Sequence, residues 1–304
     1  KKERFEIARK IVSNMTAESW ETIPHAVVSY EADVTEFMKE YKKLNEGCTD
    51  KAKKISINTV VMKIICEGLM AAPKMNCHLK FERKLVRGKL LYHNRVNVSM
   101  PVVLPDGRMM TVNLRHMESK SLLKMTEIIN DTMRRMQNTN MDEAMFEVSL
   151  DNTLKGLKKG KIKQAVLRLI GSKTGKHKVR TLKGKAKKQY YSIPERDRLT
   201  KKDIEQGTVT ISNLGSIHRD QTGMCFLLEI IPPQVTAIAV NAVRKQPTVV
   251  TDENGNDTIA IREILPLTIA FDHKALDYCD VLPFMKRLDE IFDNPAVIHE
   301  WKGE

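Results

Sequence analysis

Two hydrophobic periods alternate along this chain without a regular order, and that mixture constrains the fold more than any other feature. Amphipathic helices are predicted where apolar residues recur at helical spacing, in residues 4–20, 35–45, 58–69, 119–133 and 280–292. Strands are predicted where apolar residues alternate, in residues 26–34, 79–103, 110–114, 208–212, 235–243 and 259–271. Ser119 is the predicted cap of the fourth helix, and Pro105-Asp106-Gly107 is the predicted hairpin turn. Because there is no regular strand–helix–strand repeat, we predict an α/β fold with a two-layer arrangement of a mixed sheet and packed helices.

The net charge of +13 is concentrated in one segment of the 304 residues. Residues 151–202 contain 18 Lys or Arg and three acidic residues, a local charge of +15, so the other residues together carry −2. Within this segment, residues 154–170 have helical spacing with a lysine-rich face, whereas residues 171–188 are rich in Gly, Lys and Thr and predict loop or disorder. We therefore predict a single domain over residues 1–304, interrupted by a basic helical and loop insertion at about 138–206.

Three interpretations of this basic insertion stay open. A solvated or structural insertion is favoured, because a lysine-rich stretch usually forms solvated surface. Docking of an acidic partner or an anionic surface at residues 151–202 comes second. Nucleic acid is the least favoured partner, although Tyr190 and Tyr191 offer rings on which bases could stack.

Cysteine usage and hydropathy exclude several classes of protein. The five cysteines are widely spaced and form no C-x-x-C pair, which argues for a reducing compartment and against a disulfide framework or a zinc site. No apolar run reaches the ~18–20 residues of a membrane span, since the longest, residues 225–243, is interrupted by Glu229 and Pro232-Pro233. The first residues show no secretory signal. We expect a cytoplasmic protein with no metal and no transmembrane segment.

Two predicted strand ends carry side chains that suit acyl transfer. His273 and Asp277 are four residues apart after one strand, and Ser212 ends another. Each motif is weak alone, because a surface ion pair would explain the first and strand ends commonly resemble the second. Together they supply an imidazole with a pKa near ~6.5, which can take a thiol proton at neutral pH, and a hydroxyl that can donate to an oxyanion.

A longer series of short motifs runs along nearly the whole chain outside the basic segment. In order, they are Arg9-Lys10-Ile11, Ile23-Pro24-His25, residues 31–35, Pro73 with Asn76, residues 98–107, Ser119-Lys120-Ser121-Leu122, residues 207–215, residues 231–235 and Asp272-His273. This ordered series resembles the catalytic core of the dihydrolipoamide acyltransferases, the E2 components of 2-oxoacid dehydrogenase complexes. Those proteins share the chloramphenicol acetyltransferase fold, so the resemblance implies that fold here.

The resemblance also implies roles for four residues. His273 is expected to be the general base that deprotonates the thiol of CoA or dihydrolipoamide, and Ser212 to hydrogen-bond the oxyanion. Asp277 is expected to be structural and to pair with Arg9. In this family the active site lies in a channel between subunits of a trimer, so His273 and Ser212 would come from neighbouring chains.

The same resemblance implies substrates and partners. Coenzyme A would enter one end of the channel and a lipoyl arm the other, with the lipoyl group on a separate or missing domain. The expected assembly is a homotrimer or a larger trimer-built shell, with other dehydrogenase-complex subunits as partners.

Three departures from the family pattern leave alternatives open. Tyr278 stands where the family has glycine, Lys274 replaces the usual arginine, and residues 213–232 form a longer stretch than usual. The first hypothesis is an acyltransferase between dihydrolipoamide, or a related thiol, and CoA, either as an E2 core or as a free-standing relative. The alternatives are a non-catalytic E2-like scaffold and a same-fold CoA-dependent acyltransferase acting on a small hydroxyl or amine acceptor.

Overall fold

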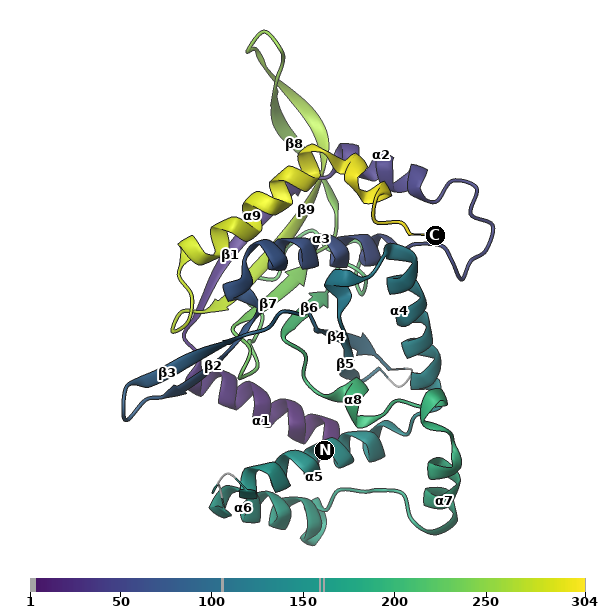
Figure 1. The fold of residues 1–304 in the computed structure, drawn as a ribbon, viewed down its shortest axis with the longest axis vertical. Helices are drawn as coiled ribbons and strands as arrows, with labels where there is room; N and C mark the ends of the chain where they lie inside the picture. Colours follow the sequence, from purple (N-terminus) through teal and green to yellow (C-terminus); the bar gives the residue numbers. More distant parts are fainter. Residues whose placement is uncertain (1–3, 105–106, 159, 161, 304) are drawn as a thin grey trace.

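The computed structural model describes residues 4–104, 107–158, 160 and 162–303. Its main strands are β1 (His25–Asp33), β4 (Val98–Val103), β5 (Met109–Leu114), β6 (Val209–Asn213), β7 (Thr236–Val240), β8 (Arg244–Thr251) and β9 (Asp257–Asp272). Within the described residues they form a seven-stranded sheet in the order β1-β9-β7-β6-β4-β5, with β8 paired to β9 (Figure 1). The parallel pairs β4–β6 and β6–β7 lie among antiparallel pairs, so the predicted α/β fold with a mixed sheet is confirmed.

Helices pack on this sheet because each presents an apolar face to it. They are α1 (Ile7–Thr22), α2 (Thr35–Leu44), α3 (Ile57–Ala71), α4 (Leu122–Gln137) and α9 (Tyr278–Asp293). Helices α3 and α9 lie side by side (Figure 1). Gly68 permits their close approach, because a Cβ at this position would lie 2.6 Å from Cδ2 of Phe284. One hydrophobic core joins these helices to the sheet and includes Phe37, Ile65, Leu114, Met125 and Phe284.

A separate two-stranded hairpin projects from the sheet end. It consists of β2 (Cys77–Glu82) and β3 (Arg87–Tyr92), and it points away from the body of the molecule (Figure 1). An isolated bridge between His78 and Gln234 ties the base of the hairpin to the residues just before β7. The hairpin base therefore lies beside the main sheet, whereas its turn does not.

Several details differ from the sequence-based expectations. Ser121 caps α4 by accepting a hydrogen bond from the Lys124 backbone N–H, whereas the predicted cap, Ser119, lies in a preceding 3-10 turn. Strand β8 is not among the predicted strands; it contains Pro247, a residue that sheets tolerate at their edges. The predicted hairpin turn joins β4 to β5, but Pro105 and Asp106 lie outside the described residues.

The segment predicted as an insertion is more ordered than its composition suggests. It contains α5 (Met141–Lys158), α6 (Ile162–Lys173), α7 (Gly184–Ser192) and α8 (Lys201–Ile204). The prediction of loop or disorder over residues 171–188 is wrong for residues 171–173, which end α6, and for residues 184–188, which begin α7. Helix α7 is held by the buried carboxylate of Glu143, which accepts hydrogen bonds from the Leu182 backbone N–H and from the Tyr191 hydroxyl. Such a tertiary contact overrides local propensity and cannot be read from composition.

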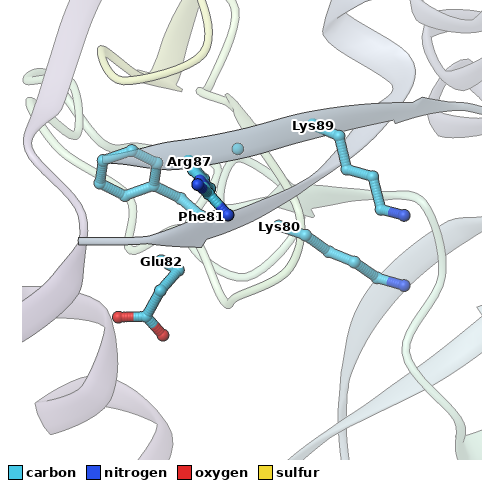
Figure 2. Close-up of a pocket in the computed structure, with 6 residues that line it drawn as sticks. Lys80, Phe81, Glu82, Arg87 and Lys89 are labelled. Carbon is cyan, nitrogen blue, oxygen red and sulfur yellow. The ribbon is translucent and has the colours of Figure 1, made fainter. Parts of the chain in front are cut away.

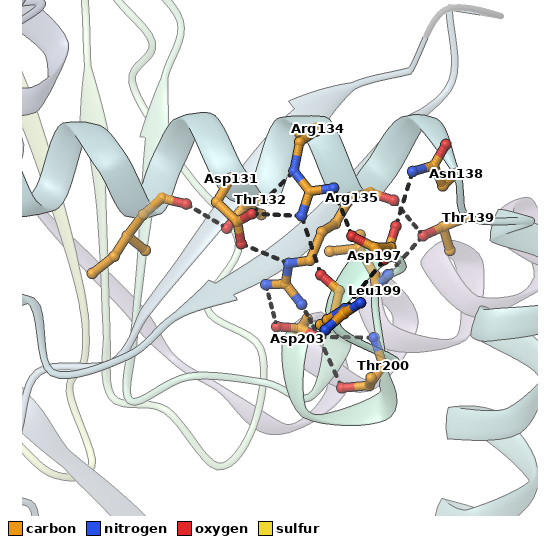
Figure 3. Close-up of polar contacts among 12 residues, drawn as sticks. Asp131, Thr132, Arg134, Arg135, Asn138, Thr139, Asp197, Leu199, Thr200 and Asp203 are labelled. Atoms are coloured by element: carbon orange, nitrogen blue, oxygen red, sulfur yellow. Dashed lines mark hydrogen bonds and ion pairs between the residues drawn. The ribbon is translucent and has the colours of Figure 1, made fainter. Parts of the chain in front are cut away.

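A network of charged side chains joins the end of this segment to α4 (Figure 3). Arg134 donates to Asp197 at 2.9 Å, and Arg135 donates to both oxygens of Asp203 at 3.0 and 2.9 Å. The Leu199 side chain is fully buried behind these pairs. Residues 197–203 are thus bound firmly to the core, although they fall inside the predicted insertion.

Two further observations concern membrane-spanning helices and the cysteines. In the part of the chain that the structure describes, no helix is both long and apolar enough to cross a membrane. All five cysteines are free thiols, and Cys66 and Cys77 are buried. Burial raises the pKa of the Cys77 thiol to about 11.

Candidate active site

The imidazole of His273 is held in one tautomer by the turn that follows β9. Its Nδ1 atom lies 3.1 Å from the carbonyl oxygen of Leu276. Because a carbonyl oxygen only accepts hydrogen bonds, Nδ1 carries the proton in the neutral ring and Nε2 keeps its lone pair. A carboxylate oxygen of Asp277 lies 3.4 Å from the same Nδ1. The His273 side chain is 55% exposed. The ring is therefore oriented as a proton acceptor that substrate can reach.

The backbone of this turn is fixed to the first helix and strand. The His273 N–H donates to the carbonyl of Pro24 at 3.0 Å. Next to it, the Asp272 carboxylate is buried and lies 3.0 Å from Lys274 Nζ. Lys274 Nζ also donates to the carbonyl of Thr22 at the end of α1. Lys274 therefore links the His273 turn to α1.

Ser212 lies near the end of β6 with only 4% of its surface exposed. Among the described residues, no partner forms a hydrogen bond with its hydroxyl. The following residue, Asn213, accepts a hydrogen bond from the Ser216 N–H at 2.8 Å and so shapes the turn after the strand. The Ser212 hydroxyl is thus available to donate to another group.

Strand register separates Ser212 from His273 within one chain. Ser212 is level with Ala239 on β7, and Ala239 is level with Thr268 on β9. His273 lies five residues further along the chain than Thr268. Two strand spacings and five residues of extended chain place the two residues on the order of 20 Å apart. One chain therefore does not bring His273 and Ser212 into one site.

Arg9 and Asp277 are not brought together either. Arg9 is exposed on α1, and no ion pair joins it to Asp277 in the part of the chain described. Instead, Asp277 precedes α9, where its N–H donates to the Asp280 carboxylate at 3.0 Å. Within one chain, Asp277 serves the start of α9 and the orientation of His273 rather than the expected pair.

Two of the sequence motifs, residues 207–215 and residues 231–235, form hydrogen bonds that connect strands of the sheet near this site. The buried Gln234 donates from Nε2 to the Gly207 carbonyl at 3.0 Å and accepts from the Thr210 hydroxyl at 2.7 Å. Gly207 has no room for a side chain, because a Cβ there would lie 2.2 Å from the Asn97 carbonyl oxygen. These motifs are therefore structural connections between β4, β6 and β7.

Three histidines beside the His273 turn were not predicted as site residues. His25 Nε2 accepts a hydrogen bond from the Ile230 N–H at 3.1 Å. The rings of His78 and His93 are 4.2 Å apart between centroids. Burial lowers the pKa of all three and brings that of His78 to about 4. The pairing of β2 with β3 brings His78 close to His93, and no local sequence spacing signals it.

A hollow of about 370 Å³ lies elsewhere, along the β2–β3 hairpin (Figure 2). Its lining contains none of the predicted site residues and consists of Lys80, Phe81, Glu82, Arg87, Gly88 and Lys89. In the residues that the structure places, no three His, Cys, Asp or Glu side chains are grouped so as to hold a metal ion.

Comparison with known proteins identifies the family. The sequence pattern of the 2-oxoacid dehydrogenases acyltransferase (catalytic domain) family matches residues 1–149 and 178–300. The chain belongs to this family. Residues 150–177, unmatched between these two parts, fall inside the predicted insertion at about 138–206 and include all of α6.

Relatives of known role are distant in sequence. The chain is 23% identical over 291 residues to the dihydrolipoyllysine-residue acetyltransferase component of the pyruvate dehydrogenase complex of Rickettsia bellii. It is 24% identical over 290 residues to the mitochondrial component of the same description from Schizosaccharomyces pombe. These alignments cover 95% of this chain but 52% and 45% of the relatives, so the chain spans about half the length of the curated relatives that it matches.

Solved structures share the fold. The structure of the cubic core of the pyruvate dehydrogenase multienzyme complex matches with a TM-score of 0.66 and 18% identity, over 98% of this chain and 93% of that one. Dihydrolipoamide acetyltransferase from Azotobacter vinelandii gives the same values. A probable dihydrolipoamide acetyltransferase from Listeria monocytogenes matches with a TM-score of 0.61 and 17% identity, over 96% and 94% of the two chains. The predicted family and its fold are confirmed.

Proposed function

We propose that this chain is the catalytic domain of an acyltransferase that moves an acyl group between dihydrolipoamide, or a related thiol, and CoA. Family membership supports the reaction class. The observation that carries the proposal is the hydrogen bond between His273 Nδ1 and the Leu276 carbonyl, because it leaves Nε2 as a base on an exposed ring. The Asp277 carboxylate, 3.4 Å from the same Nδ1, favours the same tautomer.

In the proposed reaction, His273 Nε2 takes the S–H proton of the acceptor thiol. The thiolate sulfur attacks the thioester carbonyl, and a C–S bond forms as the carbonyl oxygen becomes an oxyanion. The Ser212 hydroxyl donates to that oxyanion. The carbon–sulfur bond to the departing thiol then breaks, and the imidazolium returns its proton to the sulfur that leaves. Atoms and charge balance without a metal or a redox partner.

The proposal requires more than one chain. Since Ser212 and His273 lie on the order of 20 Å apart in one chain, we place the site between a His273 from one chain and a Ser212 from its neighbour. A homotrimer with one channel at each interface satisfies this requirement. Coenzyme A and a lipoyl group on a separate domain are the proposed substrates, and dehydrogenase-complex subunits are the proposed partners.

The direct test is acyl transfer from acetyl-CoA to dihydrolipoamide, followed in the His273→Ala and Ser212→Ala variants. Loss of the base is expected to lower kcat by ~10²–10⁴-fold. Loss of the oxyanion donor is expected to lower it by ~10²–10³-fold. An unchanged rate in His273→Ala, with the fold intact by circular dichroism, would contradict the assignment.

The exposed ring of Tyr278 favours a test of other acceptors in the same assay. Tyr278 is 54% exposed and directly follows Asp277, so it lies where an acceptor could contact it. Turnover with small alcohols or amines in place of dihydrolipoamide would support the small-acceptor alternative. CoA binding without transfer to any acceptor would support the scaffold alternative.

A further inference from the structure

Helix α6 carries an unpartnered apolar stripe on the outside of the molecule. Ile162, Val166 and Ile170 recur every four residues and are 61%, 44% and 52% exposed, and Leu167 beside them is 58% exposed. The helix packs through the side that flanks this stripe, since Ala165 is buried and α6 lies alongside α5 (Figure 1). A surface helix normally turns its apolar stripe inward. Here a row of large aliphatic side chains faces outward.

Basic side chains surround this stripe. Lys163, Arg168 and Lys176 are exposed, and none forms an ion pair with another described residue. Residues 151–202 together carry +15. An exposed aliphatic stripe next to unpaired positive charge is the composition of a helix that lies in a membrane interface.

We infer that α6 docks this protein on an anionic lipid bilayer, with the aliphatic stripe in the interface and the surrounding lysines on the phosphate headgroups. Anionic lipid attracts each Lys or Arg that lies near the membrane surface. The aliphatic stripe adds burial of apolar area. The inference does not depend on the proposed reaction.

The composition favours lipid over other occupants. Fourteen of the 18 basic residues between 151 and 202 are lysines, a residue type that protein interfaces disfavour, and the stripe has no aromatic anchor. Nucleic acid offers no apolar surface to cover Ile162 and Ile170. A second copy of this chain would bring two segments of +15 together. The family pattern, moreover, leaves out residues 150–177, so the stripe lies outside what the family shares.

Vesicle sedimentation with the full chain tests the inference. The probes are phosphatidylcholine vesicles with and without phosphatidylserine, at low and high salt. We expect binding to the phosphatidylserine vesicles alone, weakened by salt. The variant Ile162→Ser/Val166→Ser/Ile170→Ser is expected to lower the partition coefficient by at least about tenfold. Lys163→Gln/Arg168→Gln/Lys176→Gln is expected to lower it and to reduce its dependence on salt.

A matched control uses Ile259→Ser/Ile261→Ser on β9, where the two side chains are 79% and 75% exposed. This control is expected to bind like the wild type, and acyl transfer is expected to be unchanged in all variants. Absence of binding to anionic vesicles would overturn the inference. Binding that survives loss of the stripe would overturn it too, as would preference for polyglutamate or duplex DNA over vesicles.

Discussion

Lys274 supports the turn that carries His273 by neutralising a buried charge. The Asp272 side chain is 2% exposed, and its close partners are the Lys274 ammonium and the Lys274 backbone N–H. Lys274 also bonds to the end of α1 through the Thr22 carbonyl. The Lys274 ammonium therefore supplies the positive charge that the buried Asp272 carboxylate needs.

Removing this charge is predicted to destabilise the protein. Lys274→Ala leaves the Asp272 carboxylate buried without its counterion and is expected to cost about 3 kcal/mol in the free energy of unfolding. Lys274→Arg is expected to stay within about 1 kcal/mol of the wild type, because the guanidinium supplies the same charge. Urea denaturation measures both. Equal stability of the alanine variant and the wild type would contradict the role given to this pair.

The half-buried His78 is expected to make the free energy of unfolding depend on pH. Burial lowers its pKa in the folded protein from the ordinary 6.5 to about 4. The unfolded chain therefore binds more protons than the folded one between these values, and stability falls as the pH drops from 6.5 towards 4. His78→Gln is expected to reduce this loss, measured as the change in urea midpoint between pH 7 and pH 5. If His78→Gln loses as much stability between pH 7 and pH 5 as the wild type does, groups other than His78 cause the pH dependence.

At the scale of elements, the close contact between α3 and α9 depends on a glycine, Gly68, which has no side chain to keep the helices apart. A Cβ at Gly68 would lie 2.6 Å from Phe284 Cδ2 and 2.7 Å from Leu288 Cδ1. Gly68→Ala is expected to cost about 1–3 kcal/mol in urea denaturation, because it overpacks this interface. Gly156→Ala on α5 is the control, since no atom lies within 4 Å of its added Cβ. The control is expected to be neutral or slightly stabilising, as alanine favours a helix.

The same elements show how far sequence reasoning reaches. The apolar spacing of α3 and α4 and the alternation in β6 and β9 predict these elements correctly, because each is amphipathic or buried over its length. Helix α7 was not predicted, since its stability comes from the buried Glu143 of another helix. Local patterns report local preferences, and they carry no information on such distant partners.

For the site, the motifs predict which residues stand at strand ends but not how far apart these lie. Ser212 and His273 are separated by register over two neighbouring strands, a property of the whole sheet. The tautomer of His273 depends on the Leu276 carbonyl, which is set by the shape of the turn. The pairing of Asp277 with Arg9 was expected from the resemblance alone and is not made within the described chain.

At the scale of the whole molecule, the basic segment and the His273 turn occupy different parts of the chain. The +15 of residues 151–202 lies on α5 to α8, whereas His273 lies beyond β9 and beside the start of β1. Different elements therefore carry the membrane-docking surface that we infer and the base that we propose.

The most direct test of the central claim is complementation between inactive chains. His273→Ala and Ser212→Ala subunits, carrying different affinity tags, are co-expressed, and mixed oligomers are isolated through both tags. Since each proposed site takes His273 from one chain and Ser212 from a neighbour, a mixed trimer of either composition has one intact site at its three interfaces, and the doubly purified trimers are expected to show about a third of the wild-type acyl transfer. Mixed oligomers as inactive as either single variant would contradict a site shared between chains.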